Sequence, residues 1–278
     1  MFARFDFTRP RTIVLVALLI GVLAGLGGAV FHTIATEPRV EDAIAIEEAA
    51  VEADHAMAGG ESGSGEEEVS VSRTDQKGAG LFLAYALTGA AFGLFLAITS
   101  MSLRTTTGGP FRRVVVSGMV LAGAITVAPW LKYPPNPPAV GDPDSVGERE
   151  RLFVLLIVLA ALLLAGLAHL SSRLRRAEWP DDRRVAAVVG VGLVAFAVLF
   201  AAMPASPDPV GVPANLVWQF RLNSLTGNLL VWTLLTVGLG VVWSEAARRS
   251  AEAPARAVSS RGATAQNSMP FSADTPAS

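Results

Sequence analysis

The side chains best suited to bind a metal ion are two of the three histidines and the acidic residues near them. His32 lies near the end of a long apolar segment, with Glu37 shortly after it, and His55 lies in an acidic segment. Divalent transition ions accept imidazole and carboxylate ligands. His169 lies beside several arginines, which would repel a cation. The predicted metal ligands are therefore His32, Glu37, His55 and, in a later loop, Asp142.

These residues also have simpler interpretations. A lone histidine at a helix end is often an interfacial polar residue, and an acidic segment is usually solvated surface. Even so, the many carboxylates of residues 35–78 would raise the local cation concentration electrostatically. Within this segment, residues 40–57 could form a solvated helix.

A second group of polar residues lies around a proline-rich segment, residues 132–151. Proline fixes φ, so this segment is predicted to be a rigid extended loop. Such a loop could hold Tyr133, Asn136 and Asp142 in fixed positions over a pore. A rigid connector without a binding role is the alternative.

The start of the last apolar segment carries three polar residues at helical spacing, Arg221, Ser224 and Asn228. Polar groups inside a membrane helix usually face the bundle or a cavity, because lipid offers them no hydrogen bonds. We therefore expect these three residues to join Tyr133 and Asn136 at a pore mouth. Arg221 could instead extend to the headgroups.

Several classes of chemistry have no candidate residues. The chain contains no cysteine, no Gly-x-x-x-x-Gly-Lys-Ser/Thr phosphate loop, no His-Glu-x-x-His motif and no Ser-His-Asp arrangement. We expect no enzymatic activity and no tightly bound cofactor. The net charge of −2 gives no basic field for binding nucleic acid.

Composition and hydropathy predict an all-α integral membrane protein. Only 17% of the 278 residues are charged, against about 25% in soluble proteins. A membrane-spanning helix needs roughly 20 apolar residues. Six segments free of Asp, Glu, Lys and Arg meet this need and predict a bundle of six transmembrane helices: 12–34, 79–101, 114–131, 152–170, 185–203 and 222–243.

Small and aromatic residues predict how these helices pack. Two Gly-x-x-x-Gly pairs, Gly21 with Gly25 and Gly89 with Gly93, would let helix backbones approach closely. General crowding in a glycine-rich bundle is the alternative. Trp232 lies in the middle of the last segment and is predicted to pack between helices.

Basic residues predict the orientation. Of the 22 Lys and Arg residues, 15 lie in the N-terminus (1–11), in the segments 102–113 and 171–184, and after residue 243. The side richer in Lys and Arg faces the cytoplasm. Both termini are therefore predicted to be cytoplasmic, in a multi-pass protein of the plasma membrane. The loops 35–78, 132–151 and 204–221 would be extracytoplasmic, and the tail 254–278 disordered.

The first apolar segment could alternatively be a cleaved signal peptide. The apolar region of a signal peptide is about 7–15 residues long, and residues 12–34 exceed it. We therefore favour an uncleaved helix.

Two motifs resemble those of a known family. Residues 129–143 read Pro-Trp-Leu-Lys-Tyr-Pro-Pro-Asn-Pro-Pro-Ala-Val-Gly-Asp-Pro, similar to the signature loop of the CbtA family. Residues 218–225, Trp-Gln-Phe-Arg-Leu-Asn-Ser-Leu, resemble its late motif, and Phe31-His32 also fits. The hydropathy plan is similar across residues 9–245.

The resemblance implies the membrane subunit of a cobalt transporter associated with cobalamin metabolism, with Co²⁺ as the transported ion. It also implies a small single-span partner, CbtB, with a histidine-rich end. Many relatives carry a histidine cluster in the first outer loop, where this chain has acidic residues and only His55. Carboxylates alone favour harder ions, so the partner could supply the histidines.

One alternative function and one further kind of assembly remain open at the level of sequence. A non-transporting membrane scaffold or assembly protein, of unknown ligand, fits the absence of Asp, Glu, Lys and Arg from the six apolar segments. The chain, embedded in the lipid bilayer, could also assemble with copies of itself.

The predicted orientation can be tested with an epitope tag inserted between Val40 and Lys77. We expect antibody to reach this tag in intact cells, because the segment 35–78 is predicted to be extracytoplasmic. The same tag placed after Arg261 should be reached only in permeabilised cells. Labelling of the first tag only after permeabilisation would reverse the orientation.

Overall fold

The computed structural model of this chain describes residues 10–58, 72–102, 108–138, 140, 145–205 and 212–267. All regular structure within these ranges is helical. The helices are α1 (Pro10–Ala35), α2 (Glu37–Ala58), α3 (Arg73–Asp75), the π-helix η2 (Gln76–Gly80), α4 (Leu81–Ser102), α5 (Pro110–Ala122), the π-helix η3 (Gly123–Val127), α6 (Ala128–Lys132), α7 (Val146–Arg176), α8 (Asp181–Ala202) and α9 (Ala214–Asn267).

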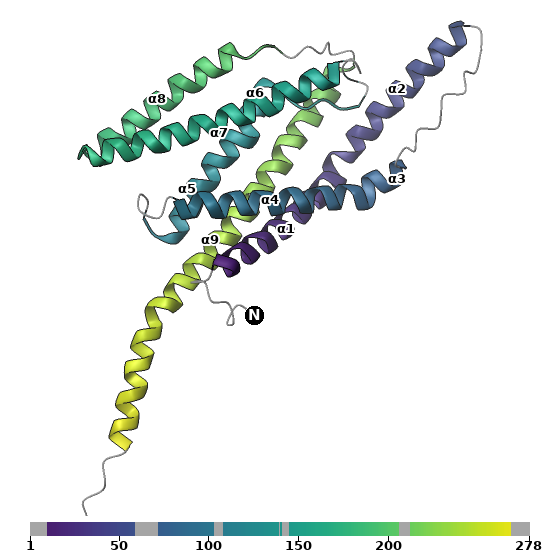
Figure 1. Ribbon diagram of the computed structural model, residues 1–278. Coiled ribbons are helices and arrows are strands. Elements are labelled where there is room, and N and C mark those ends of the chain that lie inside the picture. The colour runs from purple at the N-terminus through teal and green to yellow at the C-terminus, as the bar shows by residue number, and fades with distance from the viewer. Residues whose placement is uncertain are drawn as a thin grey trace, which may run out of the picture.

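Six helical stretches are long and apolar enough to cross a membrane, which confirms the predicted number of spans. They alternate between the two ends of the molecule (Figure 1). The end of α4, the start of α5 and the turn between α7 and α8 lie at one end. Helices α2 and α3, the short α6 and the start of α9 lie at the other, which we call the α2 end.

The third span consists of three pieces rather than one α-helix. Pro129 has no N–H to donate to the carbonyl group of Ile125, four residues earlier. The turn before this proline widens into the π-helix η3, a common way for a helix to absorb a local disruption. The helix then ends at Lys132, just before the proline-rich loop.

The last helix is longer than the sequence predicted at both ends. It begins at Ala214, inside the predicted loop 204–221, and its backbone is helical through Asn267, inside the predicted disordered tail. Residues 254–267 include several alanines, which favour a helix, but also Pro254 and Gly262, which disfavour one, so helix propensity alone does not account for this extension. Residues 268–278 of the predicted tail lie outside the described residues.

Helices α1 and α4 make the closest contact in the bundle. A Cβ atom at Gly21 would overlap the carbonyl oxygen of Gly89, and one at Gly25 would overlap that of Tyr85. A Cβ at Gly93 would likewise overlap the carbonyl oxygen of Ala17. Both Gly-x-x-x-Gly pairs therefore lie in one interface, as expected for helices that pack backbone against backbone in lipid.

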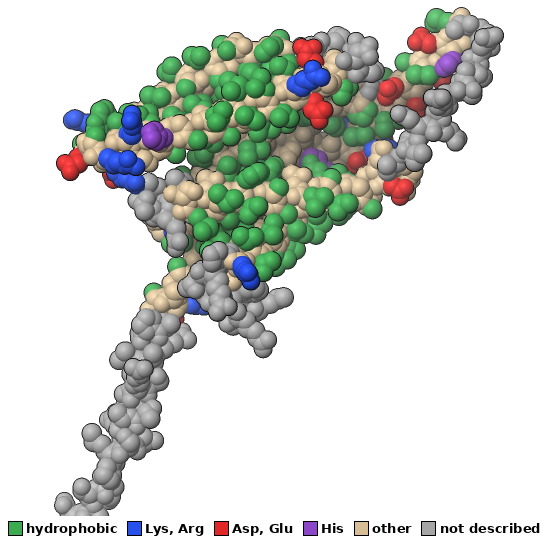
Figure 2. All heavy atoms as spheres, in the orientation of Figure 1, with side chains coloured by type: hydrophobic (Ala, Val, Ile, Leu, Met, Phe, Trp, Pro, Cys, Tyr) green, Lys and Arg blue, Asp and Glu red, His purple; other side chains and the backbone are tan. Residues whose placement is uncertain are grey.

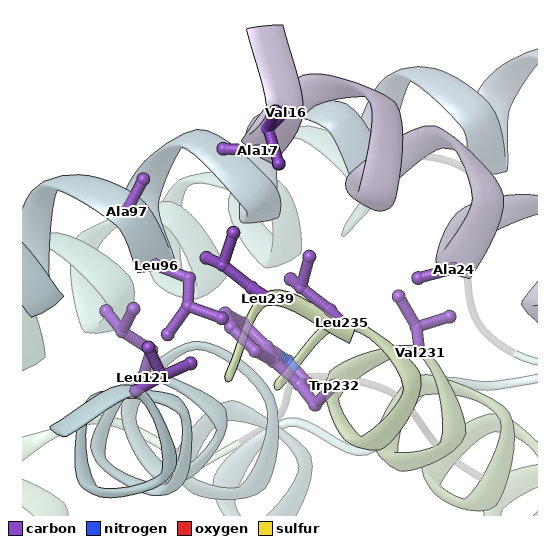
Figure 3. Packing of buried hydrophobic residues seen from close by; sticks show 11 residues of the cluster. Val16, Ala17, Ala24, Leu96, Ala97, Leu121, Val231, Trp232, Leu235 and Leu239 are labelled. Carbon is purple, nitrogen blue, oxygen red and sulfur yellow. The ribbon is translucent and has the colours of Figure 1, made fainter. Parts of the chain in front are cut away.

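Helices α5 and α9 complete a core around this pair. Leu96, Leu235, Leu239 and Trp232 are buried at its centre (Figure 3). The Trp232 ring stacks on Phe92 of α4, with centroids 4.6 Å apart. Its indole N–H donates to Thr126 Oγ1 of η3 at 2.9 Å, so the predicted packing of Trp232 between helices is confirmed.

Helices α7 and α8 form an antiparallel hairpin beside this core (Figure 1). No residue of α8 is buried, and large apolar side chains cover the hairpin surface (Figure 2). In a membrane these faces contact hydrocarbon. A small cluster of Tyr133, Leu156 and Met203 joins the hairpin to the end of α6.

The glycine contact predicts the effect of a single methyl group. Gly89→Ala places a Cβ against the backbone of α1, so the two helices must separate. We expect the free energy of unfolding in detergent to fall by about 1–3 kcal/mol, the usual cost of overpacking. Gly166→Ala in α7 is the control, since its Cβ would meet open space. Equal stability of the two variants would contradict the close α1–α4 contact.

Candidate functional site

A cavity of about 630 Å³ lies towards the α2 end, bounded by α4, η3, α6, the proline-rich loop, α7 and α9. Most of its wall is apolar or aromatic, and the space-filling view is hollowed between the α7–α8 hairpin and α4 (Figure 2). Four of the five predicted mouth residues line it: Tyr133, Asn136, Ser224 and Asn228.

Arg221, the fifth predicted mouth residue, holds the proline-rich loop against α9. Its guanidinium donates to Asn136 Oδ1 at 2.7 Å. The carbonyl oxygen of Arg221 accepts a hydrogen bond of 2.9 Å from the indole N–H of Trp130. One bond thus fixes the loop and the other fixes the preceding helix α6 on α9, and the Arg221 side chain points to the protein instead of extending to headgroups.

Tyr133 fixes the opposite side of the loop. Its hydroxyl donates to the carbonyl oxygen of Pro204 at 2.9 Å, just after α8. The side chain is buried, and burial raises the pKa of its hydroxyl, which therefore remains a neutral donor. The loop is a bridge between α9 and the α7–α8 hairpin, which agrees with the rigid segment that its prolines predict.

His32 lies buried between three helices at the α2 end. Its Nδ1 is 2.8 Å from Thr36 Oγ1, and its ring packs on Tyr85 of α4 with centroids 4.7 Å apart. The absence of a side chain at Gly227 of α9 makes room for Nε2, because a Cβ there would overlap that atom. Nε2 is buried and has no hydrogen-bond partner among the described residues.

The predicted ligand Glu37 forms an ion pair within the protein. Its carboxylate pairs with Arg73 of α3, and Glu41 pairs with Lys77 of η2 at 2.8 Å. The hydrogen bond and the charge of Lys77 lower the pKa of Glu41, so that carboxylate stays ionised. These two pairs tie the start of α2 to the chain that follows residues 59–71.

The fold does not bring the predicted metal ligands into one cluster. His55 is exposed in the last turn of α2, and about 27 Å of helix axis separates it from Glu37 at 1.5 Å per residue. Asp142 lies outside the described residues. The described residues contain no group of three or more His, Cys, Asp or Glu side chains that could hold an ion. Because α2 is a continuous helix, His32 and His55 lie too far apart to bind the same ion.

Two residues of this region make contacts that could not be predicted from the sequence. Asn223 donates its side-chain amide N–H to the carbonyl oxygen of Ala35 at 2.6 Å. Ala35 is the last residue of α1, where the helix has no backbone N–H to offer its final carbonyl groups, so Asn223 supplies the missing donor. Gly227 makes room for the imidazole of His32. Asn223 lies inside the motif 218–225, but its partner is far away in the sequence.

Fold and site together define a multi-pass α-helical membrane protein with a cavity near one end of its bundle. The chain belongs to the CbtA family, whose model, described as a probable cobalt transporter subunit, matches residues 10–244. No curated protein and no solved structure gave a match.

The contact between the loop and α9 predicts a measurable coupling. In a double-mutant cycle, Asn136→Ala and Arg221→Met should show a coupling of about 1 kcal/mol in the free energy of unfolding, because each removes the same charged hydrogen bond. Gln219→Ala is the control for Asn136→Ala, since the Gln219 side chain donates to Asn215 of the same helix. Additive effects would mean that Asn136 and Arg221 act independently.

Proposed function

We propose that this chain is the membrane subunit that carries cobalt, or a similar divalent transition ion, through the plasma membrane for cobalamin metabolism. The family match supports the transporter class and cobalt as cargo. The observation that carries the residue-level proposal is the buried imidazole of His32 at the α2 end, whose Nε2 has no hydrogen-bond partner among the described residues.

The exposed helix α2 serves as the collector of ions. Glu37 and Glu41 are held in ion pairs, but the later carboxylates of the helix are exposed and free to attract cations: Glu47, Glu48, Glu52 and Asp54. Clustered negative charge raises the local concentration of cations and the rate at which they arrive. His55 lies among these residues and adds a nitrogen donor at the tip of α2.

His32 serves as a ligand at the entrance to the bundle. With the proton on Nδ1, the imidazole donates to Thr36 Oγ1 and leaves the lone pair of Nε2 available. Metal-binding histidines usually donate their other ring N–H to an oxygen in this way. Nε2 faces the backbone of α9 at Gly227, so an ion reaches it only when α1 and α9 separate. Capture is therefore coupled to a movement of these helices.

Further ligands and the driving force come from outside this chain. One imidazole does not complete the coordination of a transition ion, and the histidine-rich end of a small single-span partner would supply more nitrogens. The sequence has no phosphate-binding loop for ATP, so an ion gradient or the partner would drive transport.

A non-transporting scaffold is the second candidate. It is favoured by the absence of any acidic and histidine cluster that could hold an ion among the described residues. The two functions predict different results for cobalt uptake. Deletion of a transporter subunit would lower uptake, whereas deletion of a scaffold would leave uptake unchanged once the proteins that it helps to assemble are present.

Uptake of labelled cobalt by a deletion strain carrying plasmid-borne variants tests the proposal. We expect His32→Ala to lower the initial rate about tenfold or more at equal protein level, because it removes the nitrogen donor. His169→Ala is the matched control, since that histidine is exposed on α7 and lies in no proposed site. Wild-type uptake by His32→Ala would remove His32 from the site, and unchanged uptake in the deletion strain would favour the scaffold.

A further inference from the structure

The cavity near the α2 end is much larger than an ion site. Ligand pockets for small organic molecules have volumes of about 300–1,000 Å³, and this cavity has about 630 Å³. A dehydrated metal ion is instead held by several donor atoms at roughly 2.0–2.6 Å, in a space hardly larger than the ion. The volume of the cavity therefore points to an organic ligand.

The wall of the cavity suits a molecule with little net charge. Phe92, Trp130 and Phe153 supply aromatic surface, and Ser224 and Asn228 supply neutral hydrogen-bonding groups. The described lining residues include one carboxylate, that of Glu150, and the neighbouring Arg149 carries the opposite charge. A bare divalent cation would lose its hydration here without gaining enough anionic or nitrogen ligands in exchange.

A chelate removes this difficulty, because its own donor atoms replace the water around the metal. If the organic ligands are anionic, they also cancel the charge of the metal, and the cost of entering a low-dielectric site falls with the charge. The outer surface of such a complex consists of CH₂ groups with a few carbonyl and amine groups. That surface matches a mostly apolar wall with a few amide and hydroxyl groups.

We infer that the cavity binds the metal as a compact, uncharged organic chelate. This inference rests on the proposed function, since it names the chemical form in which the same metal occupies the cavity. Ligation by His32 and binding in the cavity are then separate steps, because a chelate with a filled coordination sphere offers no position for an imidazole nitrogen. His32 is not among the described residues that line the cavity, so variants of His32 and variants of the cavity wall test the two sites separately.

Equilibrium dialysis of the full chain in detergent tests the inference with three probes. Tris(glycinato)cobalt(III) is an uncharged chelate that does not release its metal, hexaamminecobalt(III) is a compact cobalt complex of charge +3, and Co²⁺ is the bare ion. We expect saturable binding of the uncharged chelate and no saturable binding of the hexaammine complex.

Two variants of the cavity wall and one control assign the binding to the cavity. Ser224→Leu fills part of the space, and Asn228→Leu replaces an amide with an apolar group of similar size. Each should weaken binding of the chelate tenfold or more. Ala186→Leu, on the exposed surface of α8, should leave it unchanged. Size-exclusion chromatography and circular dichroism report whether each variant is folded.

Several outcomes would overturn the inference. Binding of Co²⁺ without binding of the chelate would do so and leave the proposed function standing. Chelate binding that both wall variants retain would place the ligand elsewhere. Phospholipid that copurifies with the wild-type chain and is lost from folded Ser224→Leu would assign the cavity to a lipid. Binding of none of the three probes would overturn the inference, whereas the proposed function, in which a partner supplies further ligands, is tested separately by cobalt uptake.

Discussion

The close approach of the α1 and α4 backbones is the contact on which the other helices are arranged. Lipid offers no hydrophobic drive for helix association, so dispersion between closely packed surfaces must supply it. Glycines at 21, 25, 89 and 93 permit this contact because they carry no Cβ. The buried leucines and Trp232 then pack α5 and α9 against the pair. The position of His32 follows, since its ring lies between Tyr85 of α4 and Gly227 of α9.

Helix α9 connects this core to the cavity. Along one helix, Arg221 holds the proline-rich loop, Asn223 caps the end of α1, and Trp232 donates to η3. Inside a membrane each of these polar groups needs a protein partner, because lipid provides none. The same requirement gives the loop a fixed shape, with Tyr133 bonded at its other side to Pro204. A movement of α9 away from α1 would therefore alter both the surroundings of His32 and the wall of the cavity.

The individual residues show where prediction from the sequence succeeded and where it failed. Helical spacing placed Ser224 and Asn228 on one face, and both line the cavity. The prolines indicated a rigid loop, which carries Tyr133 and Asn136 to the same cavity. The predicted ligands His32, Glu37 and His55 do not form one cluster, because α2 carries His55 far from the bundle and Glu37 forms an ion pair with Arg73; metal binding by each of them stays a prediction. Arg73 is separated from Glu37 by the whole acidic segment, so no local pattern links the two.

The sequence by itself determined the class of the protein, the number of its spans and its family. These properties depend on segment length, hydropathy and short motifs, each of which is contained in a continuous stretch of chain. The tertiary structure decided which polar groups meet: Arg221 with Asn136, Asn223 with the end of α1, and His32 with Gly227. Such pairs form between helices far apart in the sequence. Their geometry depends on how closely the glycine faces allow those helices to pack.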